Sequence, residues 1–185
     1  MKAAPMKSSQ YSLNLKETCK EQFMQMFGGL YEHSPWIAET VWEEIQSDDS
    51  INIETLAKKF KKTVEGATHK QKLDLLCAHP ELAGKAAMQG TLTADSTDEQ
   101  SSARLDLCSP KEYEKFHELN ARYNEKFNFP FIMAVRNSSR AEILLAFEAR
   151  IDNEMTQEFE TALQQVHKIA LLRLHAVTTF ETKKV

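Results

Sequence analysis

The chain has 185 residues, of which 23 are basic and 27 acidic, and its formal net charge is −4 at pH 7. This charge argues against a nucleic-acid-binding protein, because non-specific binding needs a concentrated basic surface that displaces counterions. Apolar residues make up 42% and charged residues 27% of the sequence, which is typical of one soluble globular domain. No apolar run approaches the roughly 18 residues of a membrane-spanning helix, so we expect no membrane association either.

The two ends of the chain are predicted to be tails around one domain. Residues 1–11 lack the apolar core of a secretory signal, and we expect a flexible N-terminal tail there. We expect a C-terminal tail at residues 179–185 and a single helical domain at residues 12–178. An odd number of cysteines without a CxxC pair favours a reducing compartment, so we predict a cytoplasmic protein. The 3 cysteines are Cys19, Cys77 and Cys108.

The first half of the chain reads as successive helices. Ser34 is the expected N-cap of a helix whose first residue is Pro35, where the missing N–H does no harm. Its apolar residues recur at helical spacing. Residues 53–65 repeat the pattern more weakly, and residues 69–78 follow. Pro80 is expected to end this last helix, because proline disfavours helical geometry in the residue before it. The apolar face of the first helix consists of Ile37, Ala38, Val41, Trp42 and Ile45.

Two later helices are expected to begin with a capping box, in which a serine and a glutamate bond reciprocally to main-chain N–H groups. The pairs are Ser109 with Glu112 and Ser139 with Glu142. A long helix is expected from about residue 153 to residue 175. A core-facing stripe of this helix consists of Met155, Phe159, Leu163, Val166 and Ile169.

Residues 128–135, "NFPFIMAV", form the one segment that reads as extended. Pro130 lies between aromatic residues, and the apolar run after it is too short for a helix of its own. No convincing set of alternating strands is present elsewhere. The sequence therefore predicts an all-α fold, a single-domain helical bundle with one short extended segment near residues 128–135.

Three stretches are not explained by helix building alone. In "HPELAGK", residues 79–85, His79 is either a helix-end residue favoured by the helix macrodipole or an acid/base group. In "STDEQSSA", residues 96–103, Ser96 or Thr97 is expected to cap a short helix. Residues 128–135 are either a buried edge segment or a backbone whose free N–H and C=O groups bind a planar polar ligand. Together the stretches supply groups that orient a heterocycle and move a proton, but their spacing leaves open whether they meet.

Common catalytic motifs are absent, including GxSxG, the Walker loop, GxGxxG and HExxH. His69 and His79 have no third ligand at a suitable spacing, so we predict no metal site and no metal cofactor. The histidines other than His79 lie in helical or helix-flanking, mostly polar contexts and are expected to be surface or packing residues. They are His33, His69, His117, His167 and His175.

Six segments of the chain together resemble the OHCU decarboxylase family, which acts on 2-oxo-4-hydroxy-4-carboxy-5-ureidoimidazoline (OHCU) in urate breakdown. In chain order they are "FGGLYEHSPWIAE", "HPELAGK", "STDEQ", "FNFPFIMAVRN", "AEILLAFEARIDNE" and "HKIALLRL". They lie between about residues 27 and 174, so the resemblance covers most of the chain. "HPELAGK" is distinctive on its own, and its combination with the next two segments in this order is highly specific.

The resemblance implies an all-helical, cofactor-independent enzyme that acts as a homodimer and converts OHCU, a ureidoimidazoline, to (S)-allantoin and CO2. It implies that His79 is the catalytic histidine and that Glu99 is the acid that assists it. Family members often carry glycine near position 137, where this chain has Asn137 after Arg136, so a contact between Arg136 and the substrate stays open. The implied substrate-binding residues are Pro80, Ser96, Thr97, Asp98, Glu99, Gln100, Phe131, Ile132, Met133, Ala134 and Val135.

On this interpretation His79 acts as a general acid/base, because the ordinary pKa of histidine lies near neutrality. Loss of CO2 spreads negative charge onto the ring heteroatoms, and protein groups that stabilise this charge make a metal unnecessary. Glu99 would orient the imidazole or bind the substrate hydroxyl, and Gln100 would bind a carbonyl or ureido group. The alternatives are an inactive helical interaction module and a protein that binds purine-derived heterocycles without catalysis.

Overall fold

The computed structural model describes residues 12–14, 16–84, 87 and 89–181. The predicted N-terminal tail and the last part of the predicted C-terminal tail, residues 182–185, lie outside the described residues. In chain order the elements are β1 (Ser12–Asn14), α1 (Lys20–Phe27), α2 (Trp36–Ile45), β2 (Ser50–Asn52), α3 (Ile53–Gly66), α4 (His69–Cys77), α6 (Ala94–Ser102), the 3-10 turn η1 (Leu105–Leu107), α7 (Pro110–Phe127), α8 (Arg140–Arg150) and α9 (Met155–Glu181).

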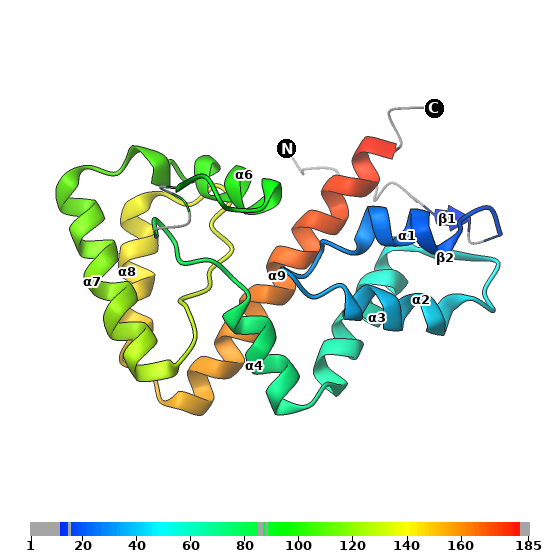
Figure 1. Ribbon diagram of the computed structural model, residues 1–185, viewed down its shortest axis with the longest axis horizontal. Helices are drawn as coiled ribbons and strands as arrows, with labels where there is room; N and C mark the ends of the chain where they lie inside the picture. Colours follow the sequence, from blue (N-terminus) through cyan, green and yellow to red (C-terminus); the bar gives the residue numbers. More distant parts are fainter. Residues whose placement is uncertain (1–11, 15, 85–86, 88, 182–185) are drawn as a thin grey trace, which may run out of the picture.

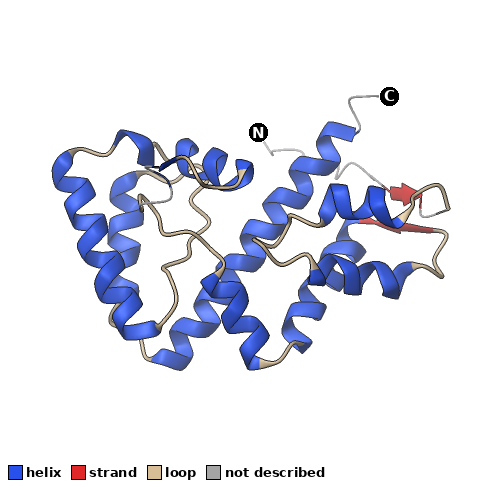
Figure 2. Ribbon diagram, viewed as in Figure 1, coloured by secondary structure: helices blue, strands red, loops and turns tan. Residues whose placement is uncertain are grey.

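Helix α9 is the central element of the fold. Figure 1 shows it crossing the molecule diagonally, with α1, α2, α3 and the strands on one side and α6, α7 and α8 on the other. Helices α3, α4 and α7 pack against α9, and α7 also packs against α8. Because both halves bury their apolar faces against the same helix, they share one core. The predicted all-α bundle is confirmed, as Figure 2 shows, and residues 129–135 form neither helix nor strand.

One small sheet was not expected from the sequence. Strands β1 and β2 pair antiparallel, with Leu13 opposite Ile51, and both of these side chains are buried. Each strand has only 3 residues, too few for the alternation of apolar and polar residues that identifies a strand. The sheet therefore adds an edge to the half built from α1, α2 and α3 without changing the fold class.

The helix boundaries follow the predicted capping signals in most cases. The capping boxes of α7 and α8 are confirmed, with Ser109 and Ser139 as N-caps. The predicted N-cap of α2 is wrong, because Pro35 holds that position. The carbonyl of Ser34 instead accepts the N–H of Ile37 at 3.2 Å, in a tighter turn before the helix. At the other end of the chain, α9 continues to Glu181, past the predicted helix end near residue 175.

The predicted core faces are largely confirmed. The five apolar residues named for α2 are all buried, as are Val166 and Ile169 of α9, while Phe159 and Leu163 are partly buried against the core. Met155 is 47% exposed, so its assignment to the core is wrong. It is the first residue of α9 and lies at the end of the bundle. Within the described part of the chain, no helix has the length and apolar character needed to span a membrane.

Candidate active site

His79 lies just after the end of α4, between the C-cap residue Ala78 and Pro80. Its side chain is only 8% exposed. The Nδ1 atom is 2.9 Å from the carbonyl oxygen of Leu75, one turn back in α4. Because a carbonyl oxygen only accepts hydrogen bonds, Nδ1 carries the proton in this contact. In the neutral ring, Nε2 is therefore the nitrogen with a lone pair available to a ligand.

Burial keeps the His79 ring neutral at pH 7. Removal from water lowers the pKa of His79 to about 4, although its bond to Leu75 and the negative charge of Glu32 act in the opposite direction. The nearby positive charge of Arg173 adds to the lowering. A neutral histidine with one free nitrogen is a proton acceptor, so His79 begins as a base.

An arginine from α9 joins two carboxylates close to this histidine. Arg173 donates through Nη1 to Glu32 Oε2 at 2.7 Å and through Nε and Nη2 to the two oxygens of Glu99, both at 2.9 Å. The hydroxyls of Thr93 and Ser96 donate to Glu32 Oε1 at 2.7 and 3.0 Å. Arg173 and Glu32 are 4% and 2% exposed. The network therefore holds charged groups from the α1–α2 loop, α6 and α9 in one place.

Hydrogen bonds and charges keep the buried members of this network ionised. Burial raises the pKa of Glu32, but the bonds from Thr93 and Arg173 outweigh it and lower that pKa overall. Burial lowers the pKa of Arg173, but the pairing of Arg173 with Glu99 and Glu32 outweighs burial and raises that pKa overall. Two carboxylates thus share one guanidinium beside a neutral imidazole. Within this arrangement the charge of Glu32 favours protonation of His79, whereas the charge of Arg173 opposes it.

A small cavity of about 30 Å³ lies among these groups. It has room for about one water molecule, so a larger ligand fits only if the lining side chains move apart. Its wall combines the turn after α4, helix α6, the irregular segment after α7 and helix α9. The lining residues are His79, Pro80, Leu82, Ser96, Glu99, Gln100, Phe131, Ile132, Met133, Val135, Ile169 and Arg173.

Most of the site residues predicted from the sequence meet at this cavity, but three do not line it. Thr97 and Asp98 lie on the exposed face of α6, and the Thr97 hydroxyl donates to the Thr93 carbonyl at 2.9 Å. Ala134 donates its N–H to Gln165 Oε1 at 3.1 Å. The predicted cap of α6 is also wrong. Thr93 is the N-cap, and its side chain accepts the N–H of Ser96, the third residue of the helix.

Gln100 uses both ends of its amide to hold the "HPELAGK" turn. Its Oε1 accepts the N–H of Ala83 at 3.1 Å, and its Nε2 donates to the Glu81 carbonyl at 3.3 Å. Ala83 has a φ of 50°, a left-handed conformation that costs a non-glycine residue energy unless its surroundings hold it. A Cβ at Gly84 would lie 2.6 Å from the Cβ of Glu81. The turn thus depends on the small residue at position 84 and on Gln100.

Sequence reasoning missed Glu32, Thr93 and Arg173. Arg173 had a usable signal, because it follows Ile169 by four residues on the core-facing stripe of α9, and a charge on such a face needs a partner. Glu32 and Thr93 had none, since each lies in or beside a loop without periodicity. Among the described residues, no group of His, Cys, Asp and Glu side chains is placed to hold a metal ion.

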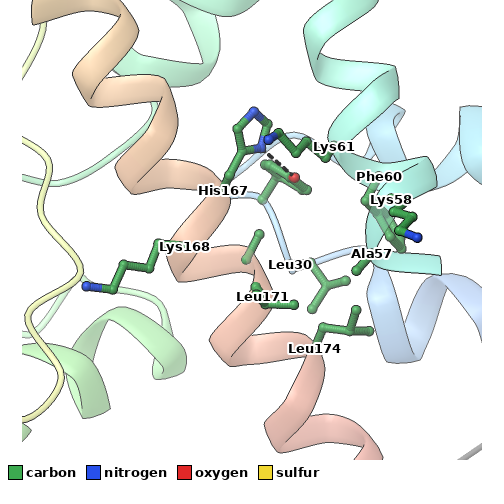
Figure 3. A pocket seen from close by; sticks show the side chains of 11 residues that line it. Leu30, Ala57, Lys58, Phe60, Lys61, His167, Lys168, Leu171 and Leu174 are labelled. Atoms are coloured by element: carbon green, nitrogen blue, oxygen red, sulfur yellow. Dashed lines mark hydrogen bonds between the residues drawn. The ribbon is translucent and has the colours of Figure 1, made fainter. Parts of the chain in front are cut away.

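A larger hollow, of about 300 Å³, lies between α3 and α9 and contains none of the predicted site residues. Figure 3 shows it lined mainly by apolar side chains, among them Leu30, Phe60 and Leu174. At one end, the Tyr31 hydroxyl bonds His167 Nδ1 at 3.0 Å. No residue that lines this hollow belongs to the Arg173 network, so we place the candidate active site at the smaller cavity.

The fold and the site together define an all-helical protein with a buried acid/base histidine beside a carboxylate–arginine network. Comparison with known proteins then places the chain. It belongs to the OHCU decarboxylase family, whose model matches residues 16–175.

Relatives and solved structures agree with this family. A protein from Halalkalicoccus jeotgali named 2-oxo-4-hydroxy-4-carboxy-5-ureidoimidazoline decarboxylase is 42% identical over 165 residues, which are 89% of this chain and 90% of that protein. A Mus musculus protein of the same name is 36% identical, over 83% and 84% of the two chains. The crystal structure of an (S)-allantoin synthase is 34% identical with a TM-score of 0.70, over 89% of this chain and 54% of that one.

Proposed function

We propose that this protein decarboxylates OHCU to (S)-allantoin and CO2 without a cofactor. The observation that carries the proposal is the position of His79, buried and neutral, with Nε2 free in a cavity that it shares with Glu99 and Arg173. Family membership supports the substrate, because proteins named for OHCU decarboxylation match nearly the whole chain. The solved neighbour named (S)-allantoin synthase supports the product.

The substrate carries a carboxylate and a hydroxyl on one ring carbon, C4, and the ureido group on its neighbour, C5. When the C4–carboxylate bond breaks, its electron pair moves into the adjacent C=N unit, and the ring nitrogen takes up a proton from water. The C4 hydroxyl then loses its proton to His79 Nε2 as the ketone forms, and C5 takes up a proton. The net result is the gain of one proton and the loss of CO2.

Histidine 79 performs both transfers in this scheme. The imidazolium formed by the first transfer donates its proton to C5, and a donor fixed on one face of the ring gives a single enantiomer. Glu32 stabilises the imidazolium, because its negative charge raises the pKa of His79 against the effects of burial and of Arg173. Main-chain groups of residues 131–135 hold the planar ring, and Pro80 lies against it.

A coupled assay tests the proposal directly. Urate, urate oxidase and hydroxyisourate hydrolase generate OHCU in solution, and circular dichroism follows allantoin. We expect a rapid signal of one sign with the parent protein, unaffected by EDTA. His79→Ala should retain the far-ultraviolet helical signal and lose this activity, since the proton relay is gone. Near-parent activity of folded His79→Ala would overturn the assigned role. Binding of allantoin without CO2 release would instead favour a heterocycle-binding protein.

We also propose that the protein is a cytoplasmic homodimer. The three cysteines are all free thiols, which suits a reducing compartment. Two large apolar side chains, Leu107 and Leu145, are 63% and 65% exposed, and contact with a second copy would remove such surface from water. Light scattering coupled to gel filtration should give twice the mass of the 21.2 kDa chain. A monomer mass at micromolar concentration would contradict the dimer.

A further inference from the structure

Residues 131–135, which supply much of the cavity wall, are held by side chains instead of by secondary structure. The Ile132 carbonyl accepts a hydrogen bond from Arg150 Nη1 of α8 at 2.7 Å. The Ala134 N–H donates to Gln165 of α9 at 3.1 Å. Figure 1 shows this stretch of chain running between α8 and α9. The shape of this segment thus depends on these two helices, because an irregular segment has no regular main-chain hydrogen bonds of its own.

Arg150 holds the side chain of this segment as well as its backbone. Its guanidinium lies 4.4 Å from the centroid of the Phe131 ring, within the range of a cation–π contact. The same ring stacks on Phe147 of α8 at 3.9 Å between centroids. Phe131 and Ile132 both line the cavity, so a single arginine contacts two consecutive residues of its wall.

A fully buried carboxylate orients this arginine. Glu158 has an exposed fraction of 0%, and its Oε1 accepts from Arg150 Nε at 2.9 Å and from the Tyr123 hydroxyl. Its Oε2 accepts from Asn153 Nδ2 at 2.6 Å. Every oxygen of this carboxylate thus has a partner. Well-packed apolar residues often stabilise a fold as well as a buried ion pair does, so stability alone does not account for Arg150 and Glu158.

We propose that Arg150, oriented by Glu158, is a positioning residue that sets the main-chain groups of residues 131–135 for the substrate. This inference rests on the proposed decarboxylase function. The Ile132 carbonyl is bound by α8 and the Ala134 N–H is bound by α9, so the residues on both sides of Met133 are held in place. The N–H and C=O of Met133 form no hydrogen bond within the described part of the chain.

The chain offers a matched control for a test of this role. Arg140, on the same helix, also donates through Nε to a glutamate, Glu112 at 2.9 Å, and through Nη1 to a main-chain carbonyl, that of Arg104 at 3.1 Å. Neither Arg140 nor its partners line the cavity. Arg150→Lys and Arg140→Lys therefore each replace a planar guanidinium with several fixed N–H donors by a single ammonium group. One substitution lies beside the candidate site and the other is remote from it.

We expect Arg150→Lys to raise KM for OHCU by roughly tenfold, because a displaced binding segment weakens substrate positioning. The smaller change should be in kcat, and the pH dependence set by His79 should stay that of the parent. Arg140→Lys should leave KM unchanged. The double variant Arg150→Met with Glu158→Leu removes the ion pair as a whole and should show the same rise in KM. A KM equal to that of the parent in folded Arg150→Lys would overturn the proposal.

A measurement that needs no turnover separates this inference from the proposed function. The N–H of Met133 and the Ile132 carbonyl that Arg150 binds belong to the same peptide unit. The Met133 amide can be followed in an NMR spectrum of 15N-labelled protein. Its resonance should shift in Arg150→Lys, with faster hydrogen exchange at Ala134, and neither should change in Arg140→Lys. Absence of turnover by the parent would refute the decarboxylase, whereas unchanged Met133 and Ala134 signals in Arg150→Lys would refute the positioning role.

Discussion

At the scale of single residues, the chemistry of His79 follows from how its two ring nitrogens are used. Nδ1 donates to the Leu75 carbonyl at 2.9 Å, so only Nε2 is available to a ligand. Burial keeps the ring neutral, and the nearby carboxylate of Glu32 favours the imidazolium once a proton arrives. A histidine in this setting can take up a proton and release it within one turnover. This suits the proposed transfer of a proton from the C4 hydroxyl of the substrate to C5.

The state of His79 leads to a prediction about pH. Because the free protein must hold His79 unprotonated, kcat/KM for OHCU should be level near pH 7 and fall on the acid side with a midpoint of about 4, well below the ordinary value of 6.5. Initial rates of allantoin formation, measured by circular dichroism at constant ionic strength, give this profile. A midpoint near the ordinary value would show that His79 is not buried in the active state.

The site residues divide according to the signal that their sequence carries. His79 and Gln100 stand in motifs that a helix does not require, so the sequence identified them as candidates. Glu32 was missed, because its partner Arg173 lies 141 residues away along the chain and no local pattern records such a contact. The predicted role of Glu99 in orienting the imidazole stays a prediction. Both of its oxygens bond Arg173, which makes its influence on His79 indirect.

At the scale of elements, α6 shows how a tertiary contact decides between local signals. The stretch "TADSTDEQSS" contains several residues that favour the N-cap, and the sequence pointed to Ser96 or Thr97. Thr93 holds the position, and Ser96 instead donates its hydroxyl to the buried carboxylate of Glu32 at 3.0 Å. The cap and the ion network thus share one helical turn, so the start of α6 is coupled to the site.

This coupling predicts that Thr93→Val affects stability and activity together. The substitution removes the side-chain cap of α6 and the 2.7 Å bond from Thr93 to Glu32. We expect a loss of roughly 1–2 kcal/mol in the free energy of unfolding and a lower kcat, because a less well-held Glu32 stabilises the imidazolium less. Urea unfolding and the allantoin assay measure the two effects.

Ser109→Ala is the matched control. It removes the side-chain cap of α7, and Ser109 is not part of the Arg173 network. It should cost roughly 1 kcal/mol of stability and leave kcat unchanged. If both variants reduced kcat to the same extent, the loss in Thr93→Val would reflect general weakening of the bundle, and the link between α6 and the site would fail.

At the scale of the whole molecule, the fold class was predictable because helical periodicity and capping are local. The apolar face of α2 and the capping boxes of α7 and α8 needed only neighbours within a turn or two. The contact of α9 with both halves of the bundle was not predictable in the same way. This contact depends on the angles at which the long helices pack. It brings Glu32, Glu99 and Arg173 together from three distant parts of the chain.

The buried histidines predict how the stability of the whole protein changes with pH. Burial lowers the pKa of His79, and also that of His167, to about 4 from an ordinary value of 6.5. Between these values the unfolded chain binds more protons than the folded one, so stability rises with pH. The contribution is complete above about pH 7 and is lost as pH falls toward 4. For His79 the loss at pH 5 is roughly 2 kcal/mol.

Urea unfolding at pH 7 and pH 5 tests this linkage. His79→Gln removes the group that protonates on unfolding, so between these pH values it should lose roughly 2 kcal/mol less than the parent. His117→Gln replaces an exposed histidine of α7 and should follow the parent. Equal losses in the parent and in His79→Gln would mean that His79 protonates as readily in the folded protein as in the unfolded chain. That outcome would also remove the basis for treating His79 as a neutral base at pH 7.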